Sequence, residues 1–224
     1  MRRTRRFTIA AALGMSTALA VGCSTEIVAP PPLDEPPAAS SPSGAVQRFA
    51  WGFNHKDVEV VSGLLTDDFQ FISAVTDSAG NQTREQRGDR SWFLVALAAL
   101  RDSASTVSFA MDQNLVPFPD SRVGKNPAFH EQVRSSVHVS VRFKAPDGNV
   151  EITGNLLFFL TRGDSAAIPQ ELIGRGVGPD STRWWMDRME DETLAGGGVV
   201  SATQPSKKNT FAGLLEYFHS LVTH

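Results

Sequence analysis

The chain has few of the residues that form covalent cross-links or hold metals. Its 224 residues include one cysteine, one tyrosine and five histidines. A single cysteine excludes a disulfide within the chain, so the folded state must rely on its apolar core. The histidines show no metal-ligand spacing, and the sequence has no phosphate-binding loop and no Gly-x-Ser-x-Gly motif. We therefore expect neither a metal nor a cofactor.

Long apolar runs are missing too, apart from a short one near the N-terminus. Four arginines within residues 2–6 precede about 15 apolar residues, which end in Leu19-Ala-Val-Gly-Cys23. This order is typical of a secretory signal and is too short to cross a bilayer as a mature helix. Its ending resembles the lipobox of bacterial lipoproteins, which implies acylation of Cys23. The alternatives are an ordinary signal peptide cut nearby, for example after Ala20, and a free buried thiol.

The chain also lacks a surplus of positive charge. Its formal net charge is −3, and removal of the four arginines with residues 1–22 lowers it to −7. Nucleic-acid binding usually needs a basic patch, so we expect no nucleic-acid partner. Attraction to anionic lipid is equally unexpected, and membrane contact depends on the lipid anchor. The expected location is the outer membrane, with the domain exported and facing the periplasm.

Two stretches of biased composition divide the chain. The segment Ile27–Pro42 contains six prolines, which favour an extended tether, and residues 195–209 are rich in glycine and polar residues. The predicted organisation is a signal peptide (1–22), a lipidated cysteine and tether (23–42), a domain (43–194), a linker (195–209) and a C-terminal amphipathic helix (210–224).

The expected domain begins with helices and continues with strands. Apolar residues at intervals of three and four predict helices that begin at Ser43, Asp57 and Asp89, separated by polar loops that include residues 76–88. Alternating residues predict strands in 69–73, 107–112, 137–143, 150–161 and 183–190, with a loop over residues 163–180. This order is typical of an α+β fold.

Three motifs carry a resemblance to a known family. They are Trp51-Gly-Phe-Asn-His-Lys-Asp57, Leu64-Leu-Thr-Asp-Asp-Phe-Gln-Phe71 and Trp184-Trp-Met-Asp-Arg-Met-Glu-Asp-Glu192. Their order and spacing resemble the nuclear transport factor 2-like superfamily, which includes ketosteroid-isomerase-like and SnoaL-like proteins, and exported bacterial lipoproteins that carry such a domain. The resemblance implies a cone-shaped, curved antiparallel sheet wrapped around N-terminal helices, with a pocket at one end.

Relatives of this fold include isomerases, dehydratases and hydrolases, so two polar residues are candidate catalytic groups. Asp187 lies between apolar residues in the last predicted strand, where a carboxylate can act as an acid or a base. The alternative is an ion pair with Arg142 or Arg188. His138 lies on the polar side of a predicted strand, either lining the pocket or facing water. The only tyrosine, Tyr217, lies beyond the domain and has no steroid-isomerase role.

Aromatic residues from five predicted elements are candidates to line the pocket. We expect them to converge, either around a small apolar ligand or as a filled core. They are Trp51, Phe71, Trp92, Phe159 and Trp185.

The last predicted helix is amphipathic. Thr210 is its expected N-cap, and Phe211, Leu214, Leu215 and Phe218 recur on one face. This face must be buried on its own domain, on a partner or at a membrane surface.

The first functional hypothesis is a lipid-anchored binding or assembly domain without catalysis. The alternative is a small-molecule isomerase, lyase or hydrolase that uses Asp187 or His138. A third hypothesis is a structural envelope protein that forms a homodimer through its sheet.

Overall fold

The computed structural model describes residues 34–76, 82–144, 148–193 and 210–223. The chain divides into a unit of residues 1–34 and a compact unit of residues 35–224, and the fold described below belongs to the second unit. The predicted signal peptide, Cys23 and the linker 195–209 lie outside the described residues.

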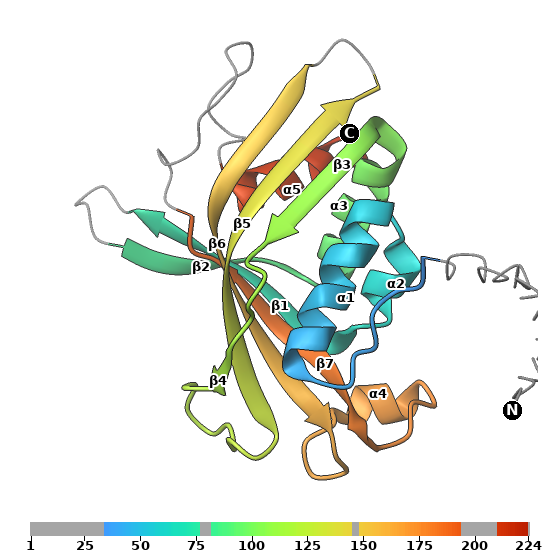
Figure 1. The fold of residues 1–224 in the computed structure, drawn as a ribbon, viewed down its shortest axis with the longest axis vertical. Coiled ribbons are helices and arrows are strands. Elements are labelled where there is room, and N and C mark those ends of the chain that lie inside the picture. The colour runs from blue at the N-terminus through green and yellow to red at the C-terminus, as the bar shows by residue number, and fades with distance from the viewer. Residues whose placement is uncertain (1–33, 77–81, 145–147, 194–209, 224) are drawn as a thin grey trace, which may run out of the picture. The chain divides into compact units, whose positions relative to one another are not determined.

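The unit contains five helices and seven strands in its described part (Figure 1). The helices are α1 (Pro42–His55), α2 (Val58–Ser62), α3 (Arg90–Ser103), α4 (Gln170–Gly174) and α5 (Phe211–Ser220). The strands are β1 (Leu65–Thr76), β2 (Gln82–Asp89), β3 (Ala104–Met111), β4 (Pro117–Pro119), β5 (His130–Phe143), β6 (Asn149–Gly163) and β7 (Asp180–Asp191).

The strands form one curved sheet in the order β2-β1-β7-β6-β5-β3, and β4 pairs with β5. Helices α1, α2 and α3 lie on one side of this sheet (Figure 1). Helix α5 packs on α3, and its rings contact residues of β1, β3 and β5. The expected α+β class, a curved sheet wrapped around N-terminal helices, is confirmed. The sheet is not wholly antiparallel, because β1 and β7 run parallel.

Side-chain caps fix the start of the helices, as the sequence predicts for α2 and α3. Asp57 accepts a hydrogen bond from the amide of Val60 (3.0 Å), and Asp89 accepts one from the amide of Trp92 (2.9 Å). The first helix begins earlier than expected. Ser41 is its N-cap, and Pro42 stands at the start of the helix, where a missing amide hydrogen is tolerated.

One predicted loop is a strand. Residues 82–89 form β2, which pairs with β1 in an antiparallel hairpin at the edge of the sheet. The side chains of residues 83–86 are exposed, so this strand has no buried face and no apolar alternation. Hydrophobic periodicity could not reveal it.

The end of the predicted tether packs on the domain, contrary to the expectation of a free tether up to residue 42. The carbonyl oxygen of Ala39 accepts a hydrogen bond from the amide of Trp184 at 2.8 Å. The carbonyl oxygen of Pro37 accepts one from Arg48 at 3.0 Å. The backbone before α1 therefore extends the domain boundary toward residue 37.

Asn54, from the first motif, joins the end of α1 to the edge strand β3. Its amide donates to the carbonyl oxygen of Phe109 (3.1 Å) and accepts from the amide of the same residue (2.6 Å). Asn54→Ala removes both bonds at a partly exposed site, so we expect a loss of about 1 kcal/mol in the free energy of unfolding. Chemical denaturation measures it. Gln47→Ala, on the exposed side of α1, is the matched control, and equal stability of the two variants would contradict this role.

Candidate functional site

The inner face of the sheet carries the main apolar core, and α5 occupies its centre. Phe211, at the start of α5, is fully buried. Its ring centroid lies 5.6 Å from that of Phe53, 6.1 Å from that of Phe71 and 5.8 Å from that of Phe109. These three rings come from α1, β1 and β3, so Phe211 lies where the helices and both ends of the sheet meet.

The rest of the apolar face of α5 is buried in the same core. Leu214, Leu215 and Phe218 have no exposed surface, and the ring of Phe218 stacks on that of Phe143 at 5.7 Å. The helix itself is the one that the sequence predicts, with Thr210 as its N-cap. Of the three surfaces on which its apolar face could be buried, the structure shows its own domain. These side chains belong to the same core cluster as residues of α1, α3 and the sheet.

Asp191, the last residue of β7, anchors the N-terminus of α5. Its carboxylate accepts hydrogen bonds from the amides of Ala212 (2.7 Å) and Thr193 (2.9 Å). The residue is 1% exposed, and no lysine or arginine pairs with it in the described residues. Burial raises the pKa of this carboxyl above its ordinary value, and the amide hydrogen bonds oppose the rise. No local pattern in the sequence predicted this role of Asp191.

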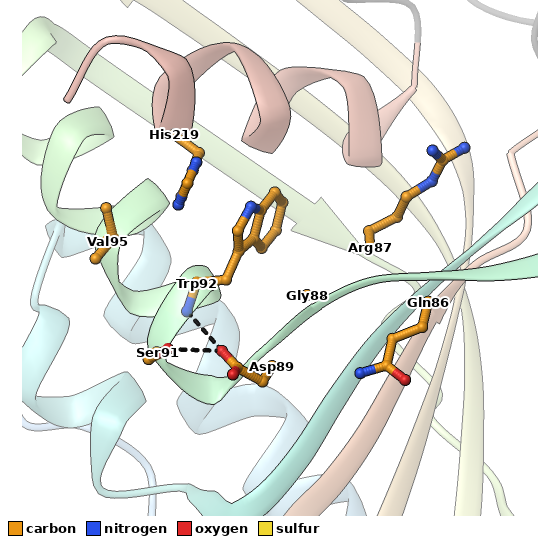
Figure 2. A pocket seen from close by; sticks show the side chains of 8 residues that line it. All are labelled: Gln86, Arg87, Gly88, Asp89, Ser91, Trp92, Val95 and His219. Atoms are coloured by element: carbon orange, nitrogen blue, oxygen red, sulfur yellow. Dashed lines mark hydrogen bonds between the residues drawn. The ribbon is translucent and has the colours of Figure 1, made fainter. Parts of the chain in front are cut away.

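An open pocket of about 520 Å³ lies between the end of β2, the start of α3 and the end of α5 (Figure 2). Trp92 is its central side chain. The indole stacks against Phe71 on one side (5.9 Å) and against the His219 ring on the other (5.2 Å). A Cβ at Gly88 would lie 2.4 Å from the Trp92 ring, so the backbone of β2 and the indole are in direct contact.

Polar groups surround the indole. Asp89 accepts hydrogen bonds from the Trp92 amide and the Ser91 hydroxyl (Figure 2). The hydrogen bond from the Trp92 amide is the main reason why the pKa of the Asp89 carboxyl is lowered, and the bond from Ser91 adds to it. Arg87 reaches the carboxylate of Glu216 on α5 at 3.4 Å. The pocket therefore borders α5, which contributes His219 to its wall.

Asp187 lies where the register of β7 shifts against β6, so that Met186 and Met189, on either side of the shift, both belong to the core while Asp187 does not. Its carboxylate forms ion pairs with Arg122 (2.7 Å) and Lys125 (2.7 Å). An ion pair was one of the two roles that we weighed for Asp187, but its partners are neither Arg142 nor Arg188. They come from the segment before β5, some 60 residues away in the chain.

His138 is exposed on β5, and its Nδ1 lies 3.1 Å from the hydroxyl of Thr153 on β6. It belongs to the solvent side of the sheet and has no contact with the core or with Asp187 among the interactions of the described residues.

The five candidate aromatic residues do not converge. Phe71 and Trp92 contact each other in the main core. Trp185 belongs to a separate cluster with Ile168 and Leu172, and Phe159 lies under the Arg122 guanidinium at 4.3 Å. Trp51 stacks on His55 at 3.9 Å. For Phe159 and Trp185 the expectation failed because these strand residues point away from the face that carries Phe71. Trp51, on α1, lies outside the core cluster.

Two further features bear on function. Across the described residues, no three histidine, cysteine or acidic side chains are grouped as a metal ion would require. In the same part of the chain, none of the helices combines the length and the apolar character of a membrane span.

The fold defines an α+β protein with a curved sheet packed around helices. No protein-family model and no curated protein matches the sequence. Solved structures do match. A protein from Novosphingobium aromaticivorans predicted to be a scytalone dehydratase is 12% identical over 75% of this chain and 89% of that chain, with a TM-score of 0.50.

Other structural neighbours include a nuclear transport factor 2-like superfamily protein from Salmonella enterica serovar Typhimurium. It is 13% identical over 71% of this chain and 92% of that chain, with a TM-score of 0.45. A ketosteroid isomerase-like protein from Erwinia carotovora atroseptica is 12% identical over 66% and 89%, with a TM-score of 0.41. At such identities, a structural likeness concerns the fold alone.

We expect Asp191→Ala to destabilise the domain, because the amides of Ala212 and Thr193 lose a buried acceptor. The expected loss is about 1–3 kcal/mol in the free energy of unfolding, measured by chemical denaturation. Asp57→Ala, which removes the cap of the short exposed helix α2, is the comparison and costs about 1 kcal/mol. A smaller effect at Asp191 than at Asp57 would contradict an anchoring role.

The pH dependence of stability tests the state of this carboxyl. The pKa of the Asp191 carboxyl is higher in the folded state than in the unfolded state, so the folded protein binds this proton more tightly. The contribution of Asp191 is then fully present below the unfolded pKa, about 3.9, and is lost as the pH rises through the folded pKa. The neutral variant Asp191→Asn should lack this loss. Parallel pH profiles for the two proteins, from chemical denaturation at successive pH values, would contradict the raised pKa.

Proposed function

We propose that this protein is an exported, lipid-anchored lipoprotein whose nuclear transport factor 2-like domain is a binding or assembly module without catalysis. The observation that carries the proposal is the position of α5. Its four apolar side chains occupy the interior of the curved sheet, where a small molecule would otherwise be enclosed. Binding by this domain then takes place on its outer surfaces.

The placement of the candidate catalytic residues supports the same proposal. Asp187 is held by Arg122 and Lys125 on the outer face of the sheet, and His138 is exposed on β5. A catalytic acid or base needs a second polar group and a reacting atom within hydrogen-bond reach. Neither residue lines the pocket beside Trp92 or the pocket between the backbone before α1 and the start of β7.

The anchored part of the proposal rests on the sequence. The basic residues 2–6, the short apolar run and the lipobox-like ending at Cys23 support export and acylation, and the proline-rich segment supports a spacer between anchor and domain. Assembly through the open face of the sheet, as a homodimer, is one form that the module can take, and it would appear as a concentration-dependent mass.

A second candidate function is a small-molecule isomerase, lyase or hydrolase. Asp191 favours it, because this buried acid with a raised pKa faces the interior next to the start of α5. Such an enzyme would have to move α5 aside before a substrate could reach Asp191.

A cavity variant separates the two functions. Phe211→Ala should leave a dry apolar cavity in the folded domain, and such cavities bind benzene. Benzene or indole should then raise the melting temperature of the variant and leave that of the wild type unchanged. Phe211→Leu, which leaves less space, is the milder variant if Phe211→Ala unfolds. A comparable rise in the wild type would show that the interior is accessible and would favour the enzyme.

The anchor has its own test. Cells that express the full chain with labelled fatty acid should incorporate label into the wild type, and Cys23→Ser should abolish it because no other cysteine exists. Equal labelling of both proteins, seen after gel separation, would remove the anchor from the proposal.

A further inference from the structure

A second pocket, of about 250 Å³, lies between the backbone that precedes α1 and the start of β7. Its walls contain two arginines, two hydroxyl side chains and two alanines. They are Ala38, Ala39, Ser40, Arg48, Thr182 and Arg183. This pocket is separate from the α5 core and from the pocket beside Trp92.

The structure holds Arg183 in place without using all of its donors. Its Nη2 donates to the carbonyl oxygen of Gly63 at 2.8 Å, and its guanidinium lies 4.8 Å above the ring of Trp185. Its Nε is buried and has no hydrogen-bond partner. A buried donor without an acceptor costs free energy unless a ligand or water satisfies it.

Arg48, on α1, is held in a similar way. Its Nη1 donates to the carbonyl oxygen of Pro37 at 3.0 Å, which orients the guanidinium beside the backbone that lines the pocket. Each arginine has five N–H donors, so most of the donors of both remain for a ligand.

The charge of the two arginines is not neutralised by the domain. Neither forms an ion pair with an acidic side chain in the described part of residues 57–223. Asp180, which is close enough to act on Arg183, instead accepts hydrogen bonds from the amide (2.9 Å) and the hydroxyl (2.6 Å) of Thr182. Burial lowers the pKa of Arg183, and the like charge of Arg48 lowers it further. The whole chain is acidic, so this pair of cations is a local feature.

We propose that this pocket is a binding site for an anionic group, a phosphate or a carboxylate, which Arg48 and Arg183 contact together. Planar guanidinium groups match the oxygen geometry of both anions and form charge-assisted hydrogen bonds with them. A bound anion would offset the repulsion between the two arginines. The site goes beyond the proposed function and does not depend on it.

Titration with pyrophosphate at constant ionic strength tests the site, with the full chain carrying Cys23→Ser so that no acyl chain contributes. Isothermal calorimetry should show saturable binding that Arg48→Gln and Arg183→Gln each weaken about tenfold or more. Arg183→Lys keeps the positive charge but loses the planar guanidinium that can donate two parallel hydrogen bonds, so it should also weaken binding. Arg142→Gln, an exposed arginine on β5, removes the same charge elsewhere and should bind as the parent does. Circular dichroism and the melting temperature without anion show that each variant is folded.

A vesicle-binding experiment distinguishes a lipid headgroup from a soluble anion as the natural ligand. Binding to phosphatidylglycerol vesicles but not to phosphatidylcholine vesicles, lost in Arg48→Gln and Arg183→Gln, assigns the site to a lipid headgroup. Pyrophosphate binding without vesicle binding assigns it to a soluble anion. Pyrophosphate affinity that is equal in the parent, Arg48→Gln and Arg183→Gln, or no binding by the parent to either probe, would overturn the proposal.

Discussion

The structure depends on the burial of one face of α5 inside the curved sheet. Burial of an aliphatic or aromatic side chain contributes about 1.5–3 kcal/mol, and four such side chains of α5 are fully buried. A ten-residue helix is marginal by itself in water, so α5 needs the core as much as the core needs α5. Asp191 fixes where the helix enters, because its carboxylate accepts the amide of Ala212. Sheet and helix therefore form one cooperative unit.

The position of α5 also bears on where a ligand could bind, because its apolar side chains belong to the core inside the curved sheet. Asp187 is engaged by Arg122 and Lys125, so it contributes to structure. Arg48 and Arg183 line a pocket near the end of the proline-rich segment, and each keeps N–H donors beyond the one that holds it in place.

Local patterns in the sequence predicted the helices and the strands with a buried face. Asp57, Asp89 and Thr210 cap the helices that they were expected to cap, because capping is decided within three residues. Strand β2 was missed because its side chains are exposed. The meeting of Asp187 with Arg122, and of Asp191 with Ala212, is set by tertiary packing between distant segments. Local periodicity carries no information about such pairs. For the same reason it could not show that Trp185 and Phe71 belong to different clusters, and their predicted convergence was wrong.

Amide hydrogen exchange tests the position of α5 most directly. If the helix is part of the central core, its amides at Leu214, Leu215 and Phe218 exchange only through global unfolding. The protection of these amides then equals that of the amides in the central strands β5 and β6. On addition of denaturant, the protection of all these amides decreases together. Exchange of the α5 amides that is orders of magnitude faster than that of β5 and β6 would show that the helix leaves the interior while the sheet stays folded. It would contradict the closed interior.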